Sequence, residues 1–128
     1  MAALSDYLEN ELLDHALGTG SFTAPTNVYL SLYTTDPTDA DTGNELSGNG
    51  YSRQLITFGA ASGGSATNTT QETFTASGGN FGTITHVALH DASSNGNLLF
   101  HAELSSSRTV NDGESIVFAI GDVTVSLA

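Results

Sequence analysis

Val28-Tyr29-Leu30-Ser31-Leu32-Tyr33 is the stretch that decides the fold class. Its apolar residues Val28, Leu30 and Leu32 stand two positions apart, which is the period of a β-strand with one buried face. Runs of a similar kind follow at 51–58, 72–76, 83–90, 97–104, 115–120 and 122–127. Seven or eight short strands separated by turn residues are typical of a sandwich. The sequence therefore predicts a mainly β protein, a jelly-roll-like β-sandwich over residues 21–128.

The alternation also indicates which side chains fill the core of this sandwich. We expect the core to contain Leu30, Leu32, Ile84, Leu98, Phe100, Ile116, Phe118, Val123 and Val125.

Turn residues separate the expected strands. Ser94-Asn95-Gly96 and Asn111-Asp112-Gly113 each predict a tight hairpin, because Asn-Gly and Asp-Gly accept the positive φ of type I′ turns. Residues 34–50 and 59–70 are rich in Gly, Ser, Thr, Asn and Asp, and we expect both to be long loops at the rim of the sandwich.

Residues 1–20 predict an amphipathic helix in front of the sandwich, within one globular domain. Ser5 is a suitable N-cap, and Asp6 and Glu9 lie in the first turn, where the helix dipole favours anions. Apolar residues then recur at helical spacing and form a stripe of Leu8, Leu12, Leu13, Ala16 and Leu17. This stripe must be covered, either by the chain's own sheet or by another subunit. We interpret its four leucines as assembly residues.

Charge excludes one class of partner. The 128-residue chain has 14 Asp and Glu but only 2 Lys and Arg, for a formal net charge of -12. A nucleic-acid partner is therefore not expected, because phosphate binding depends on Lys and Arg. No apolar run approaches the ~20 residues that span a bilayer, so no membrane partner is expected either. The two cations, Arg53 and Arg108, are interpreted as further assembly residues and should form ion pairs, within one subunit or across a subunit boundary.

No catalytic residues, cofactor or metal site are predicted. The chain has no cysteine and no nucleophile elbow. His86 and His90 lie four residues apart, roughly 13 Å along a strand, which is too far for shared metal coordination. His101 could face one of them, but zinc takes three or four ligands. Asn68-Thr69-Thr70 fits the N-glycosylation pattern, which matters only on a eukaryotic secretory route.

Residues 34–50 are acidic and carry the remaining candidate contacts. Their spacing does not fit the EF-hand pattern, so a calcium site of another kind stays an open alternative. Tyr33 and Tyr51, which flank this segment, could help to recognise a sugar or another receptor. The candidate receptor or ion contacts are Asp36, Asp39, Asp41, Glu45, Tyr33 and Tyr51.

Several segments resemble a family of small phage virion proteins commonly labelled tail-fibre-like. The resemblance spans nearly the whole chain and is carried by residues 3–15, 28–39, 50–54, 81–86, 90–92, 96–101 and 121–125. It implies a virion part with a β-sandwich body, assembled in the cytoplasm of the host bacterium, and it brings no catalytic residues with it.

The chain has neither a repeat nor the extended heptads of a fibre shaft. We therefore expect a non-enzymatic structural module that forms a homo-oligomer, as a trimer, and binds the major capsid or tail proteins of its virion. It would decorate or cement the capsid surface, or attach to the tail. The alternative is a tail-fibre or tail-tip module that binds a host glycan or receptor.

Overall fold

The protein is described by a computed structural model over residues 2–127. In that part the chain forms one helix and nine strands, so the prediction of a mainly β fold with one N-terminal helix is confirmed. The elements are β1 (Ala3–Leu4), α1 (Asp6–Ala16), β2 (Val28–Tyr33), β3 (Gln54–Ile56), β4 (Ser65–Thr67), β5 (Glu72–Thr75), β6 (Gly82–His90), β7 (Leu98–Val110), β8 (Ser115–Phe118) and β9 (Thr124–Ser126). No helix among these residues is both long and apolar enough to cross a membrane.

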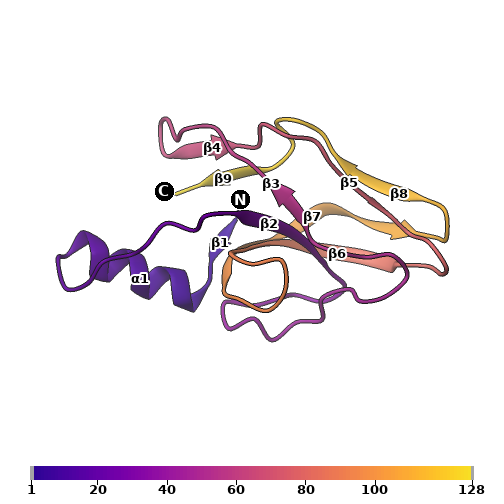
Figure 1. The fold of residues 1–128 in the computed structure, drawn as a ribbon, viewed down its shortest axis with the longest axis horizontal. Coiled ribbons are helices and arrows are strands. Elements are labelled where there is room, and N and C mark those ends of the chain that lie inside the picture. The colour runs from indigo at the N-terminus through magenta and orange to yellow at the C-terminus, as the bar shows by residue number, and fades with distance from the viewer. Residues whose placement is uncertain (1, 128) are drawn as a thin grey trace.

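The strands form one large sheet and two small ribbons, and every pairing is antiparallel. The large sheet has the order β1-β7-β6-β2-β3, and the ribbons are β4-β9 and β5-β8. Figure 1 shows both ribbons above the large sheet, and α1 extending beyond its edge. Apolar side chains from the sheet and from both ribbons meet between these layers.

The core assignments are largely confirmed. Residues of the main core cluster are Leu30, Leu32, Ile56, Phe74, Ala76, Phe81, Ile84, Leu89, Val110, Ile116 and Phe118, with Phe100, Val123 and Val125 partly buried against them. Leu98 is buried as expected, but it belongs to a second cluster with Tyr33 and Ala88. This second cluster marks the face of the large sheet that turns away from the ribbons, hereafter the outer face.

One expected hairpin is wrong. Residues 111–113 connect β7 to β8, but β8 pairs with β5 and not with β7. The turn is closed by Asn111, whose carbonyl accepts a bond from Glu114 N (2.9 Å), while Gly113 N donates to the carbonyl of Ala76 beside β5 (2.8 Å). Gly113 has φ +84°, which allows the chain to leave the sheet here and enter the other layer.

Two further expectations need revision. The hairpin at Asn95-Gly96 is present between β6 and β7, but the connection runs over residues 91–97 and is held by Asp91, whose carboxylate accepts from the backbone and side chain of Asn97. The expected loop 59–70 contains a strand, β4, paired with β9. Its Ser, Ala and Thr side chains do not alternate between apolar and polar. The strand is therefore determined by its pairing with β9 and not by a local sequence pattern.

A single buried amide joins the two ribbons. Asn68 Nδ2 donates to the carbonyls of Thr70 (2.7 Å) and Ala119 (3.0 Å), and its Oδ1 accepts from the amides of Gly121 (2.9 Å) and Val123 (3.0 Å). The side chain therefore uses its full hydrogen-bonding capacity inside the fold. The glycosylation pattern at this position thus belongs to a buried structural residue.

Candidate functional site

The start of α1 is fixed to the sheet by Ser5, as the N-cap assignment predicts. Ser5 Oγ accepts from Leu8 N (3.1 Å) and donates to the carbonyl of Leu98, and Ser5 N donates to the carbonyl of Leu99 (2.9 Å). β1, which precedes it, pairs with β7. The first turn of the helix is therefore part of the chain's own fold.

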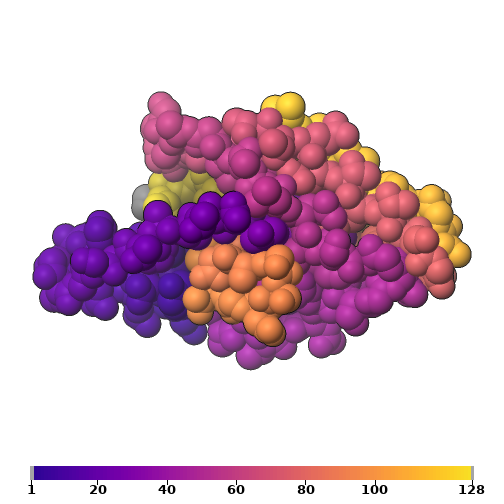
Figure 2. Space-filling model, viewed as in Figure 1, coloured from indigo at the N-terminus to yellow at the C-terminus, as the bar shows by residue number. Residues whose placement is uncertain are grey.

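The four leucines of the helix have different environments. Leu8 is buried and Leu12 is half-buried, whereas Leu13 is 57% exposed and Leu17 is 74% exposed. The helix thus covers its own body with the first half of the stripe and leaves the second half in solvent. Figure 2 shows this end of the helix projecting from the rest of the molecule.

An apolar groove of about 370 Å³ lies beside the helix. Leu8 and Leu12 form its helix side, and Phe22 of the segment after α1, together with Val125 and Leu127 near the end of the chain, contributes to the remaining walls. Leu127 is itself 51% exposed. The groove and the exposed leucines of α1 therefore place apolar surface on and beside the helix.

The outer face of the large sheet is covered by residues 34–50, hereafter the acidic loop. Asp39 Oδ1 lies 2.7 Å from Nε2 of His101 on β7. Asp36 Oδ1 lies 3.8 Å from Nδ1 of the same ring and 4.0 Å from Nε2 of His86 on β6. Three histidine–carboxylate contacts therefore join this loop to two strands.

A buried network continues beneath the loop. His90 Nδ1 lies 2.9 Å from Ser31 Oγ, and its Nε2 lies 3.2 Å from the hydroxyl of Tyr33, which donates to Asp41 Oδ1 (2.8 Å). Burial raises the pKa of Tyr33, and the bond to Asp41 raises it further. Burial lowers the pKa of His90. Ser31 and His90 are both fully buried, so no substrate can reach the hydroxyl, and the arrangement is structural.

Glu45 forms a second polar centre at the far end of the loop. It accepts two bonds from Arg53, from Nε to Oε2 and from Nη2 to Oε1 (both 2.8 Å), and one from the hydroxyl of Tyr51 (2.6 Å). Burial alone would raise the pKa of Glu45, but these bonds outweigh it and lower the pKa. Arg53 Nη1 also donates to the carbonyls of Ala92 and Asn95.

The ion pair expected of Arg53 is therefore present within one chain. Arg108 is exposed on β7 and, among residues 2–127, has no carboxylate within 4.0 Å. Its use in an ion pair between subunits stays a prediction.

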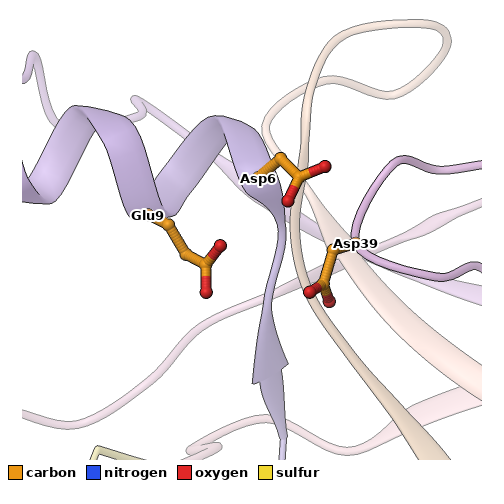
Figure 3. Close-up of side chains that lie close together, drawn as sticks. All are labelled: Asp6, Glu9 and Asp39. Atoms are coloured by element: carbon orange, nitrogen blue, oxygen red, sulfur yellow. The ribbon is translucent and has the colours of Figure 1, made fainter.

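The four acidic residues proposed as ion contacts do not gather at one point. Asp36 and Asp39 lie against histidines, whereas Asp41 and Glu45 accept hydroxyl bonds from Tyr33 and Tyr51. Asp39 also lies close to the start of the helix. One carboxylate oxygen from each of Asp6, Glu9 and Asp39 lies within 4.8 Å of the other two (Figure 3). All three are exposed, and exposed acidic groups are common without a bound ion.

A polar groove of about 630 Å³ opens between the acidic loop and the turn at 93–96. Asp41, Glu45, Tyr51 and Arg53 line it, so it contains three of the candidate receptor or ion contacts. Tyr33 is 2% exposed and offers no free ring face.

The contacts between the acidic loop and the histidines of β6 and β7 were not predicted from the sequence. Asp39 and His101 are 62 positions apart, and only the pairing of β6 with β7 and the path of the loop bring them together. The alternation of side chains along the strand does place His86 and His90 on one face, and this shared face was the signal in the sequence for a histidine-lined surface.

Comparison with known proteins agrees with this structure. Residues 3–126 match the family described as Podophage GP4 fiber I protein gp80. No curated protein sequence matches the chain. The family match spans nearly all of the residues that form the sheet, the ribbons and the helix, and the chain therefore belongs to this family of phage fibre proteins, which implies a structural part of the virion.

Proposed function

We propose that this protein is a non-enzymatic, self-assembling module of the phage fibre, whose copies associate through the end of the molecule that carries α1. The observation that carries this proposal is the exposed pair Leu13 and Leu17 beside the apolar groove. Contiguous apolar surface of this kind marks interaction sites on soluble proteins.

The position of the helix supports this assignment. Its first turn is fixed by Ser5 and the buried Leu8, so the rest of α1 is held rigidly beyond the edge of the sheet. A rigid helix with a leucine pair on its free part can pack against a neighbouring copy at little cost in conformational entropy. We propose that three copies associate in this way and that the trimer contacts other tail proteins.

Of the two locations that the sequence leaves open, the tail is favoured over the capsid surface by the fibre family. A fibre that reaches a receptor needs a long shaft, and residues 2–127 form a body of short strands. A module that connects other parts at a joint of the fibre agrees with the fibre family and with a body that has no long shaft within residues 2–127.

The test is the oligomeric mass of a variant that carries Leu13→Gln and Leu17→Gln. We expect the unaltered chain to sediment as a trimer and the variant as a monomer, with the same β-type circular dichroism spectrum and a cooperative melt at a lower temperature, because association stabilises the folded state. Leu55→Gln on β3 is the matched control, because Leu55 is 49% exposed and lies on the sheet, away from the helix. A monomeric unaltered chain, or a variant that remains trimeric, would contradict the proposal.

The polar groove favours a second candidate function, a tail-tip module that binds a host glycan. Its hydrogen-bonding lining from Asp41, Glu45 and the serines at 93 and 94 suits hydroxyl groups. If this candidate is correct, Ser93→Tyr with Ser94→Tyr should abolish binding of the purified protein to host cells, while Leu13→Gln with Leu17→Gln should leave it intact. Absence of binding by the unaltered protein would exclude this candidate.

A further inference from the structure

The two ribbons are built from the same two stretches of chain and have two different edges. β4 runs into β5 through residues 68–71, and β8 runs into β9 through residues 119–123. On the side of β4, the segment that follows β3 pairs with the ribbon, since Thr69 N donates to the carbonyl of Thr57 (2.8 Å). On the other side, within residues 2–127, β8 pairs with β5 alone and β9 with β4 alone. The outer edge of β8 is therefore without a neighbouring strand, and it is hereafter called the free edge.

The register of β8 shows which of its backbone groups point to the free edge. Ala76 N donates to the carbonyl of Glu114 (2.9 Å), one step before the first residue pair of the ribbon. Residue pairs of an antiparallel ladder alternate between hydrogen-bonded and non-hydrogen-bonded. The first and third residues of β8, Ser115 and Val117, are therefore not bonded to β5. Their N–H and C=O groups point to the free edge, where a further strand could bond to them.

The free edge lacks the features that commonly block the addition of a strand. Natural edge strands are protected by lysine, by proline, by inward-pointing charges or by a covering segment. Between Glu114 and Asp122 the chain has no charged residue and no proline, and the side chains of Val117 and Ile120 are exposed. Free backbone groups beside exposed apolar side chains are the pattern that recruits an extended segment of another chain.

The charges of the chain indicate which kind of segment fits. Glu114 precedes the free edge and Asp122 follows it, in a chain of net charge -12. A strand with a basic residue at each end is therefore favoured over one with acidic ends. A second copy offers no such strand, because its only cations are Arg53 and Arg108, and Arg53 is bonded to Glu45 within its own fold. The charges therefore favour a different protein over a second copy.

We propose that the free edge of β8 is a docking site for an extended segment of a different protein, with apolar side chains between basic ends, which adds to the β5–β8 ribbon as a third strand. Figure 1 shows β8 at the end of the molecule opposite α1. The docking site is thus separate from the surface of Leu13 and Leu17, and the inference does not depend on the association of copies through α1.

Amide exchange, measured residue by residue by NMR and corrected for intrinsic rates, tests the free edge in the unaltered chain. We expect the amides of Ser115 and Val117 to exchange about tenfold or more faster than those of Ile116 and Phe118, because only the latter two bond to β5. Slow exchange of all four amides would overturn the proposal, since the edge would then be covered. Slowing that increases with protein concentration would overturn it in favour of a second copy.

A short synthetic peptide that alternates threonine with valine and has a lysine at each end is the probe for docking. At a peptide concentration of about ten times the dissociation constant, we expect exchange of the Ser115 and Val117 amides to slow by about tenfold. The amide of Thr73 is the internal control, because Thr73 is the cross-strand partner of Val117 on β5 and its N–H points to the opposite edge of the ribbon. Slowing at Thr73 equal to that at Val117 would overturn docking at the free edge.

The ends of the peptide test the charge of the partner. The same peptide with a glutamate at each end should bind about threefold or more weakly, from charge contacts of ordinary surface strength. Equal binding of the two peptides, or no binding of the lysine-ended peptide at about 1 mM, would overturn the proposal.

Proline substitutions at the free edge give matched variants. Val117→Pro removes an N–H that points to the free edge and leaves the bonds between β8 and β5 in place. It should weaken binding of the lysine-ended peptide by about tenfold or more, whereas Val117→Thr keeps this N–H and should stay within about threefold. Ser115→Pro removes the other such N–H and replaces the first variant if its circular dichroism spectrum is not that of the fold. Unchanged peptide binding by a folded proline variant would overturn the proposal.

Discussion

At the scale of single residues, Asn68 makes an unusually large contribution to the fold for a polar side chain in a Ser- and Thr-rich segment. Asn68 is itself buried, and Asn68→Ala would leave the carbonyls of Thr70 and Ala119 without this donor and the amide of Val123 without this acceptor, in hydrogen bonds that are all partly buried. Each unsatisfied buried group costs about 1–3 kcal/mol. We expect the variant to lose about 3 kcal/mol of unfolding free energy.

Urea unfolding measures this loss. Thr67→Ala, one residue earlier and exposed, should change the unfolding free energy by less than about 0.5 kcal/mol. If the two variants were equally stable, Asn68 would not be the link between the ribbons.

His90 makes the stability of the domain depend on pH. Its pKa in the fold is lowered by burial, below the value of about 6.5 for a histidine in an unfolded chain. The contribution of the neutral ring is therefore complete above about pH 6.5 and is lost as the pH falls toward the lowered pKa. We expect the unfolding free energy of His90→Gln to fall less steeply from about pH 8 to pH 5 than that of the unaltered chain.

Urea unfolding at several pH values gives the two slopes. Identical slopes for His90→Gln and the unaltered chain would contradict the lowered pKa of the buried His90 ring.

At the scale of elements, Arg53 fastens the acidic loop to the β6–β7 turn. Its guanidinium bonds to Glu45 on the loop and to the carbonyls of Ala92 and Asn95 in the turn. Lysine cannot reproduce this planar set of four donors. We expect Arg53→Lys to lose about 2 kcal/mol of unfolding free energy, whereas Arg108→Lys at an exposed position should lose less than about 0.5 kcal/mol. A loss at Arg53 no larger than at Arg108 in thermal unfolding would contradict this role.

The elements differ in how far the sequence predicts them. Alternation identified β2 and β6, and Ser5 with the leucines identified α1, because in these segments local pattern and burial agree. β7 was expected to end at residue 104 but continues to Val110, because residues 108–110 pair with β6 again after a register shift between Ile84 and His86. The exposed Ser105–Ser107 stretch lies within that shift and carries no apolar signal.

The candidate site was predictable in its residues but not in its contacts. Asp36, Asp39, Asp41 and Glu45 stood out by charge, yet the contacts of Asp36 and Asp39 with His86 and His101 depend on long-range pairing. Tyr33 and Arg53 lie only eight positions from Asp41 and Glu45, but no local pattern joins them. The turn at 111–113 shows the same limit. Its Asp-Gly pair correctly indicates a positive φ at Gly113, but whether the chain returns beside β7 or crosses to β5 is decided by tertiary packing.

At the scale of the whole molecule, the net charge of -12 opposes association of identical copies. Mobile ions screen such repulsion, with a Debye length of about 10 Å at 0.1 M salt. If assembly is driven by Leu13, Leu17 and the apolar groove, the association constant should rise between about 20 and 300 mM NaCl. Sedimentation at several salt concentrations measures this constant. A decrease with salt would mean that attraction between opposite charges drives the contact, and would contradict an apolar interface between copies.

The division of the second layer into two ribbons also determines how the domain responds to mechanical load. β9 is held to β4 by three residue pairs, and β1 is held to β7 by two. Tension applied through either of these outer strands meets a short antiparallel ladder, which separates pair by pair. The β5–β8 ribbon and the long β6–β7 pairing lie inside those two points of attachment. A load applied at β1 or β9 would therefore act first on these two short pairings and only then on the interior of the fold.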